Sequence, residues 1–225
     1  YLLWDHSFEL PHKHLEAEAL IHDSVPVGKE THKLKVKGVD QMEVYDFPGE
    51  YAQRFDGVNK GGGEQAAELQ KIFQDRERTV RLRMDEETTP AVVIRAKSSV
   101  KHLVPGYKFT LQRHFNADGA YLLTSVKHAA TCGAGYRSGE EAALTYENEA
   151  LCIPAAMPYR PRRTTPKPVV QGSQTAVVVG PPGEEIFTDK YGRVKVQFHW
   201  DRYGKKNEKS SCWVRVSSPW AGKSF

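Results

Sequence analysis

The chain has 225 residues, of which 39% are hydrophobic and 27% charged, and its formal net charge is +4. This length allows one large or two modest domains with a buried core, and the composition is ordinary for a globular protein. No apolar run approaches the roughly 18 residues of a membrane-spanning helix. Residues 1–10 lack the basic flank and apolar centre of a signal peptide, so we expect no export by that route.

The charge is distributed unevenly along the chain. Residues 154–225 hold 13 Lys and Arg against 5 Asp and Glu, a net charge of +8, whereas residues 1–153 hold 19 against 23, a net charge of −4. A basic segment can mark a nucleic-acid footprint. It can equally place cations on solvent-facing strands that pack against acidic neighbours in an assembly.

Three cysteines, Cys132, Cys152 and Cys212, lie far apart and include no Cys-x-x-Cys pair. An odd, scattered set fits a reducing cytosol better than a disulfide framework or a zinc knuckle. We expect all three to be small, buried or half-buried side chains.

The first 31 residues are polar and mixed. His12 and His14 would share one side of a strand, but no third ligand follows at a recognisable spacing, so we expect solvent-facing histidines and no metal site. A short amphipathic strand is expected over residues 32–39, and Pro48-Gly49 predicts a turn. The glycines of residues 61–63 lack the ending of a phosphate-binding loop.

From about residue 63 to residue 88, apolar side chains recur at spacings near 3.6 with charged residues between them, which predicts a helix. After Pro90 the pattern returns to strands. These are expected at residues 91–96, 107–113, 120–128 and 144–153, with a hairpin turn at 116–119 and a Gly- and Ser-rich loop at 131–139.

Residues 154–172 contain five prolines with Arg160, Arg162 and Arg163 among them, which is typical of an extended, stiff connector. We therefore predict one domain over residues 1–153, a connector over 154–171 and a second domain over 172–225.

In the second domain, Val194, Val196, Phe198 and Trp200 alternate with Arg193, Lys195, Gln197 and His199. A period of two predicts a strand with a buried apolar face and a wet polar face. Further strands are expected at residues 176–179 and 212–217, which together favour a small antiparallel barrel or sandwich. Phe198 and Trp200 are expected in the core, and Trp213 at the surface or at a subunit contact.

Residues 183–225 closely resemble the VgrG family of type VI secretion spike proteins. The resemblance is carried by Asp189, residues 191–196, 198–202, 212–216 and 220–222. Weaker matches at residues 45–49, 103–106, 109–111, 151–154 and 160–161 extend it over nearly the whole chain.

The resemblance implies a mainly β fold with one helix: a phage-tail-hub-like β-barrel domain, here partial, followed by an OB-type small β-barrel, here cut short. It implies a structural component of the puncturing spike, which trimerises on the Hcp tube and delivers effectors through target membranes. The implied partners are two further copies, the Hcp tube, a PAAR-type tip protein and effectors, with the target membrane pierced transiently. The implied location is the cytoplasm during assembly, followed by injection into the extracellular space or a target cell.

No reaction is predicted from the residues themselves. His199 and Asp201 point the same way on a strand without a nucleophile, Glu184 and Glu185 face opposite sides, and Ser211 lacks a strand-to-helix turn. We therefore predict no enzyme, no catalytic, cofactor-binding or metal residue, and no cofactor. An OB-type nucleic-acid-binding protein and a phage baseplate hub remain alternatives. Nucleic acid is not expected, because stacking platforms must be exposed whereas the aromatic residues are predicted to be core.

Overall fold

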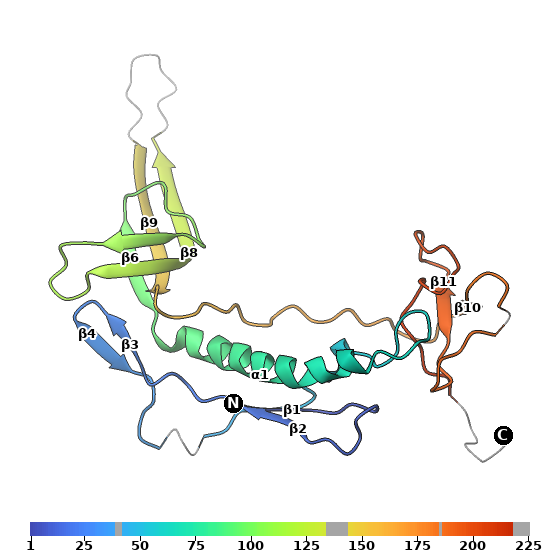
Figure 1. The fold of residues 1–225 in the computed structure, drawn as a ribbon. Coiled ribbons are helices and arrows are strands. Elements are labelled where there is room, and N and C mark those ends of the chain that lie inside the picture. Colours follow the sequence, from blue (N-terminus) through green and yellow to red (C-terminus); the bar gives the residue numbers. More distant parts are fainter. Residues whose placement is uncertain (39–41, 134–143, 185, 218–225) are drawn as a thin grey trace. The chain divides into compact units, whose positions relative to one another are not determined.

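The computed structural model describes residues 1–38, 42–133, 144–184 and 186–217 (Figure 1). Within this part of the chain the fold is mostly β with a single α-helix, as predicted. The chain divides into two compact units. The first unit comprises Tyr1–Trp4, Glu16–Gly49 and Glu77–Thr164, and the second unit comprises Asp5–Leu15, Glu50–Arg76 and Thr165–Phe225.

A four-stranded antiparallel sheet dominates the first unit. Its strands are β6 (Ile94–Ser98), β7 (Lys108–Leu111), β8 (Gly119–Cys132) and β9 (Leu144–Pro154), in the order β6-β9-β8-β7. The long strands β8 and β9 run side by side (Figure 1). All four strands were predicted to within a few residues. The connection from β7 to β8 covers residues 112–118 and is longer than the predicted turn.

The first unit buries apolar side chains on the sheet. Tyr121, Leu123, Ala150 and Cys152 pack with Val27, and the rings of Phe109 and Tyr121 stack at 5.6 Å. A second cluster joins Val25, Ile153 and Met157. Alternate residues of the strands therefore point into the core, as expected for a sheet with one buried face.

Shorter strands precede the sheet in the chain. β3 (Ser24–Val27) and β4 (Glu30–Lys33) form a hairpin, while β1 (Leu2–Asp5), β2 (Leu15–Glu18) and β5 (Tyr45–Asp46) form a sheet in the order β2-β1-β5. The predicted strand at 32–39 is realised only at its start, and residue 39 lies outside the described residues. The strands β1 to β3 escaped prediction because each spans only four residues, too few for a period of two to stand out.

The turn of the β3–β4 hairpin requires glycine. Gly28 has φ +60°, and a Cβ atom there would lie 2.0 Å from the carbonyl oxygen of Asn116. The next residue, Lys29, donates its backbone N–H to that same oxygen at 2.8 Å. A side chain at residue 28 would therefore break the contact between the hairpin and the β7–β8 connection.

The helix α1 (Ala66–Thr88) confirms the predicted helix, including its C-terminal half. Ile72 and Val80, eight residues apart on one face, are fully buried. The hydroxyl of Thr88 donates to the carbonyl of Met84 in the last turn, and a 3₁₀ turn at Thr89–Ala91 contains Pro90. No described helix is both long enough and apolar enough to cross a bilayer.

The second unit contains the antiparallel pair β10 (Ala176–Val179) and β11 (Lys195–Phe198) and a 3₁₀ turn at Ala52–Arg54. The strand predicted at 212–217 is reduced to one bridge between Val194 and Val214. Tyr51 is fully buried, and its hydroxyl donates to the carbonyl of Leu15.

The cysteines differ from the expectation. Cys152 is buried, but Cys132 and Cys212 are exposed, so the prediction for these two was wrong. Burial raises the pKa of the Cys152 thiol, which lowers its thiolate fraction at neutral pH. In a titration with a chromogenic disulfide, we expect two thiols of the native chain to react quickly and the third only after unfolding. Three equally fast thiols in the native chain would contradict this burial pattern.

Residues 159–164 of the expected connector are held by ion pairs within the first unit. Arg163 contacts Glu86 at 3.1 Å and Asp46 at 3.5 Å, and Arg160 lies 3.6 Å from Asp85. The hydroxyl of Tyr1 donates to Asp46 at 2.8 Å. This segment is thus irregular in backbone but fixed by its arginine side chains.

Tyr1 provides a test of this network. Burial, followed by the hydrogen bond to Asp46, raises the pKa of Tyr1 to about 12. Because the fold favours the neutral phenol, the stability from this contact is present below about pH 10 and is lost as the pH rises through 12. We expect the phenolate absorbance difference between the chain and Tyr1→Phe to appear near pH 12 in the folded protein and near about 10 in denaturant. A folded-state midpoint near the denatured one would contradict the network.

Candidate functional site

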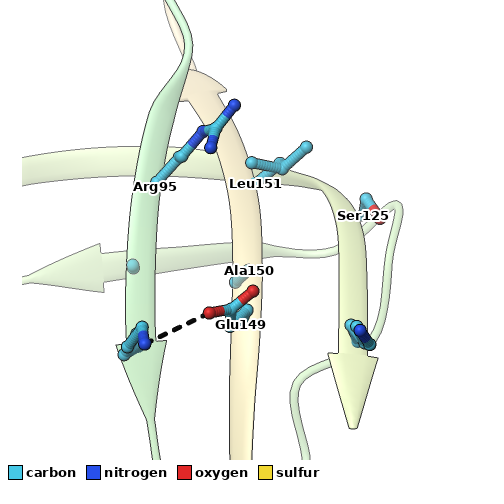
Figure 2. Close-up of a pocket in the computed structure, with 8 residues that line it drawn as sticks. Arg95, Ser125, Glu149, Ala150 and Leu151 are labelled. Carbon is cyan, nitrogen blue, oxygen red and sulfur yellow. Dashed lines mark ion pairs between the residues drawn. The ribbon is translucent and has the colours of Figure 1, made fainter.

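The outer face of the four-stranded sheet carries a hollow of about 560 Å³, which we call the outer hollow (Figure 2). Its lining residues come from β6, β8 and β9. They are Arg95, Ala96, Lys97, Ser125, Lys127, Glu149, Ala150 and Leu151.

Strand register explains why these side chains share one face. Across β6 and β9, Arg95 lies opposite Leu151 and Lys97 opposite Glu149. Across β8 and β9, Ser125 lies opposite Leu151 and Lys127 opposite Glu149. Directly opposed residues point to the same side of a sheet, so three cations and one carboxylate gather there.

A β-bulge in β8 makes this arrangement possible. Leu123 pairs with Cys152 in the core, while Ser125, only two residues on, pairs with Leu151. In a regular strand these two side chains would face the same side. The extra residue, Thr124, donates its hydroxyl to the carbonyl of Leu151 at 3.1 Å. Because of this insertion, the residues of β8 after Thr124 point to the opposite side of the sheet from the one a regular strand would give them.

The chemistry of the outer hollow is that of a contact surface. Lys97 and Glu149 form an ion pair at 3.2 Å, drawn as the dashed line in Figure 2, and both side chains are exposed. Such a pair contributes about 0–1 kcal/mol. Ser125 is the only hydroxyl in the lining and no histidine accompanies it, so the lining offers no activated nucleophile. The sequence analysis assigned no functional role to any of these residues.

The second unit corrects the predicted facing of β11. Arg193, Lys195 and Gln197, which we call the buried polar row, are 5%, 0% and 5% exposed. The prediction that this face is wet was therefore wrong. Among the apolar partners, only Val196 is buried, while Val194 and Phe198 are half-buried.

Arg193 is the centre of an ion network inside the second unit. Its guanidinium donates to both carboxylate oxygens of Asp56 at 2.9 Å, and its Nε donates to Asp189 at 2.5 Å. It also lies over the rings of Phe8 and Tyr191, at 5.4 and 5.3 Å from their centroids. This one side chain thus joins three separate stretches of sequence.

The charges of the network stabilise one another. Burial alone would lower the pKa of Arg193, but its hydrogen bonds to Asp56 and Asp189 outweigh burial and raise that pKa. Burial would likewise raise the pKa of Asp56, but the hydrogen bonds from Arg193 and from the backbone N–H of Val58, together with the positive charge of Arg193, outweigh burial and lower that pKa. Both groups therefore stay charged at neutral pH.

Lys195 and Trp213 form the second part of this interior. Nζ of Lys195 donates to the carbonyl of Ser211 at 2.9 Å and lies 4.4 Å from the ring centroid of Trp213. Burial lowers the pKa of Lys195. Trp213 is 8% exposed and donates its indole N–H to the carbonyl of Asn59 at 2.8 Å. The expectation of an exposed or subunit-contact Trp213 was wrong.

The apolar side of β11 is only partly buried, and Trp200 lies beyond the end of the strand. Trp200 is 64% exposed, and its ring stacks on Phe198 at 5.1 Å with 12° between the planes. The prediction that both rings belong to the core was therefore wrong. An alternating pattern shows that the two faces of a strand differ, but it does not show which face is buried, and in β11 the buried face is the polar one.

The other residues considered from the sequence do not converge. His12, His14 and His199 are exposed, and Asp201 accepts backbone N–H bonds from Tyr203 and Gly204. Glu185, residues 134–143 of the predicted loop and the motif at 220–222 lie outside the described residues. Within the described ranges, no three His, Cys, Asp or Glu side chains gather closely enough to hold a metal ion.

Comparison with known proteins agrees with the β-rich architecture. The phage tail baseplate hub (GPD) family matches residues 2–134. The type VI secretion system spike protein VgrG1b of Pseudomonas aeruginosa is 42% identical over 185 residues, which cover 81% of this chain and 22% of that protein. VgrG2a of the same organism is 34% identical over 229 residues, covering 97% of this chain and 23% of that protein.

A third relative is named as a toxin. The actin cross-linking toxin VgrG1 of Vibrio cholerae is 41% identical over 147 residues, covering 64% of this chain and 13% of that protein. The chain thus spans about a quarter or less of the length of these relatives. With more than half of its residues matched by the hub family, and with spike proteins as its relatives, the chain belongs to the phage tail baseplate hub (GPD) family and is a homologue of the VgrG type VI secretion spike proteins.

Proposed function

We propose that the chain is a structural part of a type VI secretion spike that trimerises on the Hcp tube and delivers effectors through target membranes. The observation that carries this proposal is the match of the hub family together with relatives named as spike proteins. In this proposal residues 1–153 belong to the hub-like domain, 154–171 form the connector and 172–225 belong to an OB-type barrel.

The interior of the second unit suits a mechanical role. Arg193 binds two carboxylates that belong to stretches more than a hundred residues apart in sequence, and the network is held by charge-assisted hydrogen bonds of 2.5 to 2.9 Å. Charge-assisted bonds of this length are among the stronger polar contacts in proteins. They restrain sliding between chain segments when a shaft transmits force.

The proposal assigns no chemistry of its own to the chain. The toxin activity in the name of the Vibrio cholerae relative belongs to that protein, of which this chain covers 13%. We propose that a homotrimer, the Hcp tube, a PAAR-type tip protein and effectors are the partners. The proposed route is assembly in the cytoplasm followed by injection.

The test is a chimera of VgrG1b from Pseudomonas aeruginosa in which the 185 matched residues are replaced by those of this chain. In cells whose own spike genes are deleted, we expect the chimera to restore release of Hcp into the medium. The same spike with the matched residues deleted is the negative control. A stable, correctly folded chimera that releases no Hcp would refute the proposal.

The chain alone offers a second measurement. We expect sedimentation to show a monomer or a weakly associating trimer at micromolar concentration, because permanent interfaces commonly bury about 2,000 Å² or more and this chain spans about a quarter or less of the length of its relatives. A tight trimer of the isolated chain would contradict this expectation about its association.

A further inference from the structure

Three aromatic side chains of the second unit lie at the end of β11 and in the loop after it, and we call them the aromatic platform: Phe198, Trp200 and Tyr203. Trp200 is held by its stack on Phe198 and by its indole N–H, which donates to Gln174 at 2.9 Å. Tyr203 is 84% exposed, and Arg202 lies over its ring and donates to its hydroxyl at 3.2 Å. These rings are therefore oriented before any ligand arrives.

Four cations share the loop that follows β11 with Tyr203. Arg202, Lys205, Lys206 and Lys209 are all exposed. The loop encloses a hollow of about 400 Å³ whose lining includes Tyr203, Lys205 and Lys209. A ligand in this hollow would touch an aromatic face and two ammonium groups together.

The carboxylates of the loop do not neutralise these cations. Asp201 lines the same hollow and accepts backbone N–H bonds from Tyr203 and Gly204, each at 3.0 Å. Asp201 and Glu208 offset two of the four cations, which leaves residues 201–209 with a net charge of +2. Glu208 is half-buried. The potential above the platform is thus positive, in keeping with the net charge of +8 over residues 154–225.

Two kinds of occupant compete for such a face. An apolar protein surface would cover Trp200 but would leave four exposed cations without partners, at a desolvation cost. A single-stranded nucleic acid carries flat bases and phosphates at alternating positions, and it satisfies rings and cations together. The sequence-based argument against nucleic acid assumed buried rings, and the exposure of Trp200 removes that assumption.

We propose that this face of the second unit binds single-stranded nucleic acid without strong sequence preference. Bases stack on Trp200 and Tyr203, and phosphates lie beside Lys205, Lys206 and Lys209. This binding is independent of the spike role and requires only that the second unit is folded.

The test uses the full chain and a fluorescein-labelled oligo-dT of about 15 nucleotides, followed by fluorescence anisotropy. We expect a dissociation constant in the micromolar range at low salt that weakens steeply as salt rises from about 50 to 200 mM. Trp200→Ala and Tyr203→Ala should each weaken binding by about 5- to 100-fold, because base stacking on one aromatic ring contributes about 1–3 kcal/mol. The double variant Lys205→Ala/Lys209→Ala should make the dissociation constant depend less steeply on the salt concentration.

Matched control variants test whether binding depends on the aromatic platform or on any exposed ring or charge of the chain. Phe115→Ala removes a ring that is 78% exposed in the first unit, and Lys108→Ala removes an exposed lysine there, so both should leave the affinity unchanged. Because Trp200 and Tyr203 are exposed, circular dichroism of both variants should match that of the parent chain.

Three results would overturn the proposal. The first is no binding of oligo-dT at low salt. The second is binding that Trp200→Ala and Tyr203→Ala leave unchanged, or equal binding of a double-stranded oligonucleotide, since either would show attraction by charge alone. The third is a self-association that Trp200→Ala abolishes in a chain that binds no oligonucleotide, which would make the platform an interface between copies.

Discussion

Arg193→Ala is expected to lower the free energy of unfolding by about 3–5 kcal/mol, the usual cost of removing one partner of a buried ion pair. The guanidinium is buried, and the side chain of Asp189 is fully buried beside it. Without Arg193, that carboxylate would lose its charged partner in an interior that cannot hydrate it. The turn at Asp189 would also weaken, because the same carboxylate accepts the backbone N–H groups of Tyr191 and Arg193.

Urea denaturation followed by circular dichroism measures this loss, and two variants make it specific. Arg202→Ala removes an arginine that is exposed in the same unit and should change the free energy of unfolding by less than about 0.5 kcal/mol. Arg193→Lys keeps the charge but not the two-pronged contact with Asp56, so it should fall between the parent and Arg193→Ala. Equal stabilities of Arg193→Ala and Arg202→Ala would refute the role of the network.

Acid should reveal the same network. Because the pKa of Asp56 is lowered in the folded chain, its contribution to stability is present above its ordinary value of 3.8 and is lost as the pH falls below it. The parent chain should therefore lose stability in this range more steeply than Asp56→Asn. Parallel pH profiles of the two chains would show that the Arg193–Asp56 contact contributes little.

Periodicity predicted most of the framework because regular elements follow their side-chain pattern. The helix α1 and the long strands β8 and β9 repeat apolar residues over many turns or pleats, so neighbouring side chains reinforce one interpretation. The strands β1 to β4 span four residues each, too few for a period to stand out from mixed polar sequence.

The candidate sites were harder to predict, for two physical reasons. The outer hollow depends on the bulge at Thr124, an irregularity that no alternating pattern contains. The buried polar row depends on partners that are distant in sequence: Arg193 is satisfied by Asp56, and Lys195 by the face of Trp213. Such partners offset the desolvation cost of burying a polar side chain. A local sequence pattern cannot reveal partners that are distant in sequence.

The resemblance to spike proteins succeeded where local patterns failed, because it compares many residues in order. It identified the family from the stretch at residues 191–202, in which the structure reverses the predicted facing. A motif can therefore be recognised correctly while the role of each side chain within it is misread. Trp213, which belongs to the same set of matching residues, provides the clearest test of that distinction.

Trp213→Ala is expected to lower the free energy of unfolding by about 3–5 kcal/mol, as truncation of a buried aromatic side chain usually does. The ring packs against Phe187 at 5.2 Å and covers the ammonium group of Lys195. Its removal leaves a cavity and an uncovered buried cation, and the carbonyl of Asn59 keeps only the hydrogen bond from the backbone N–H of Gly62 at 3.1 Å. Trp213→Phe restores much of the apolar volume but not the N–H donor, so it should cost about 1–3 kcal/mol.

The exposed Trp200 supplies the matched control, because Trp200→Ala removes an equal ring without opening a cavity and should cost far less. Repeating the unfolding measurement at several concentrations of the chain then distinguishes burial of Trp213 within one chain from its burial between copies. If Trp213 is an internal residue, the loss in Trp213→Ala is the same in dilute and concentrated samples, since no association is involved. A loss that appears only when the parent chain self-associates would instead place Trp213 at a subunit contact, and the interior of the second unit would have to be reassigned.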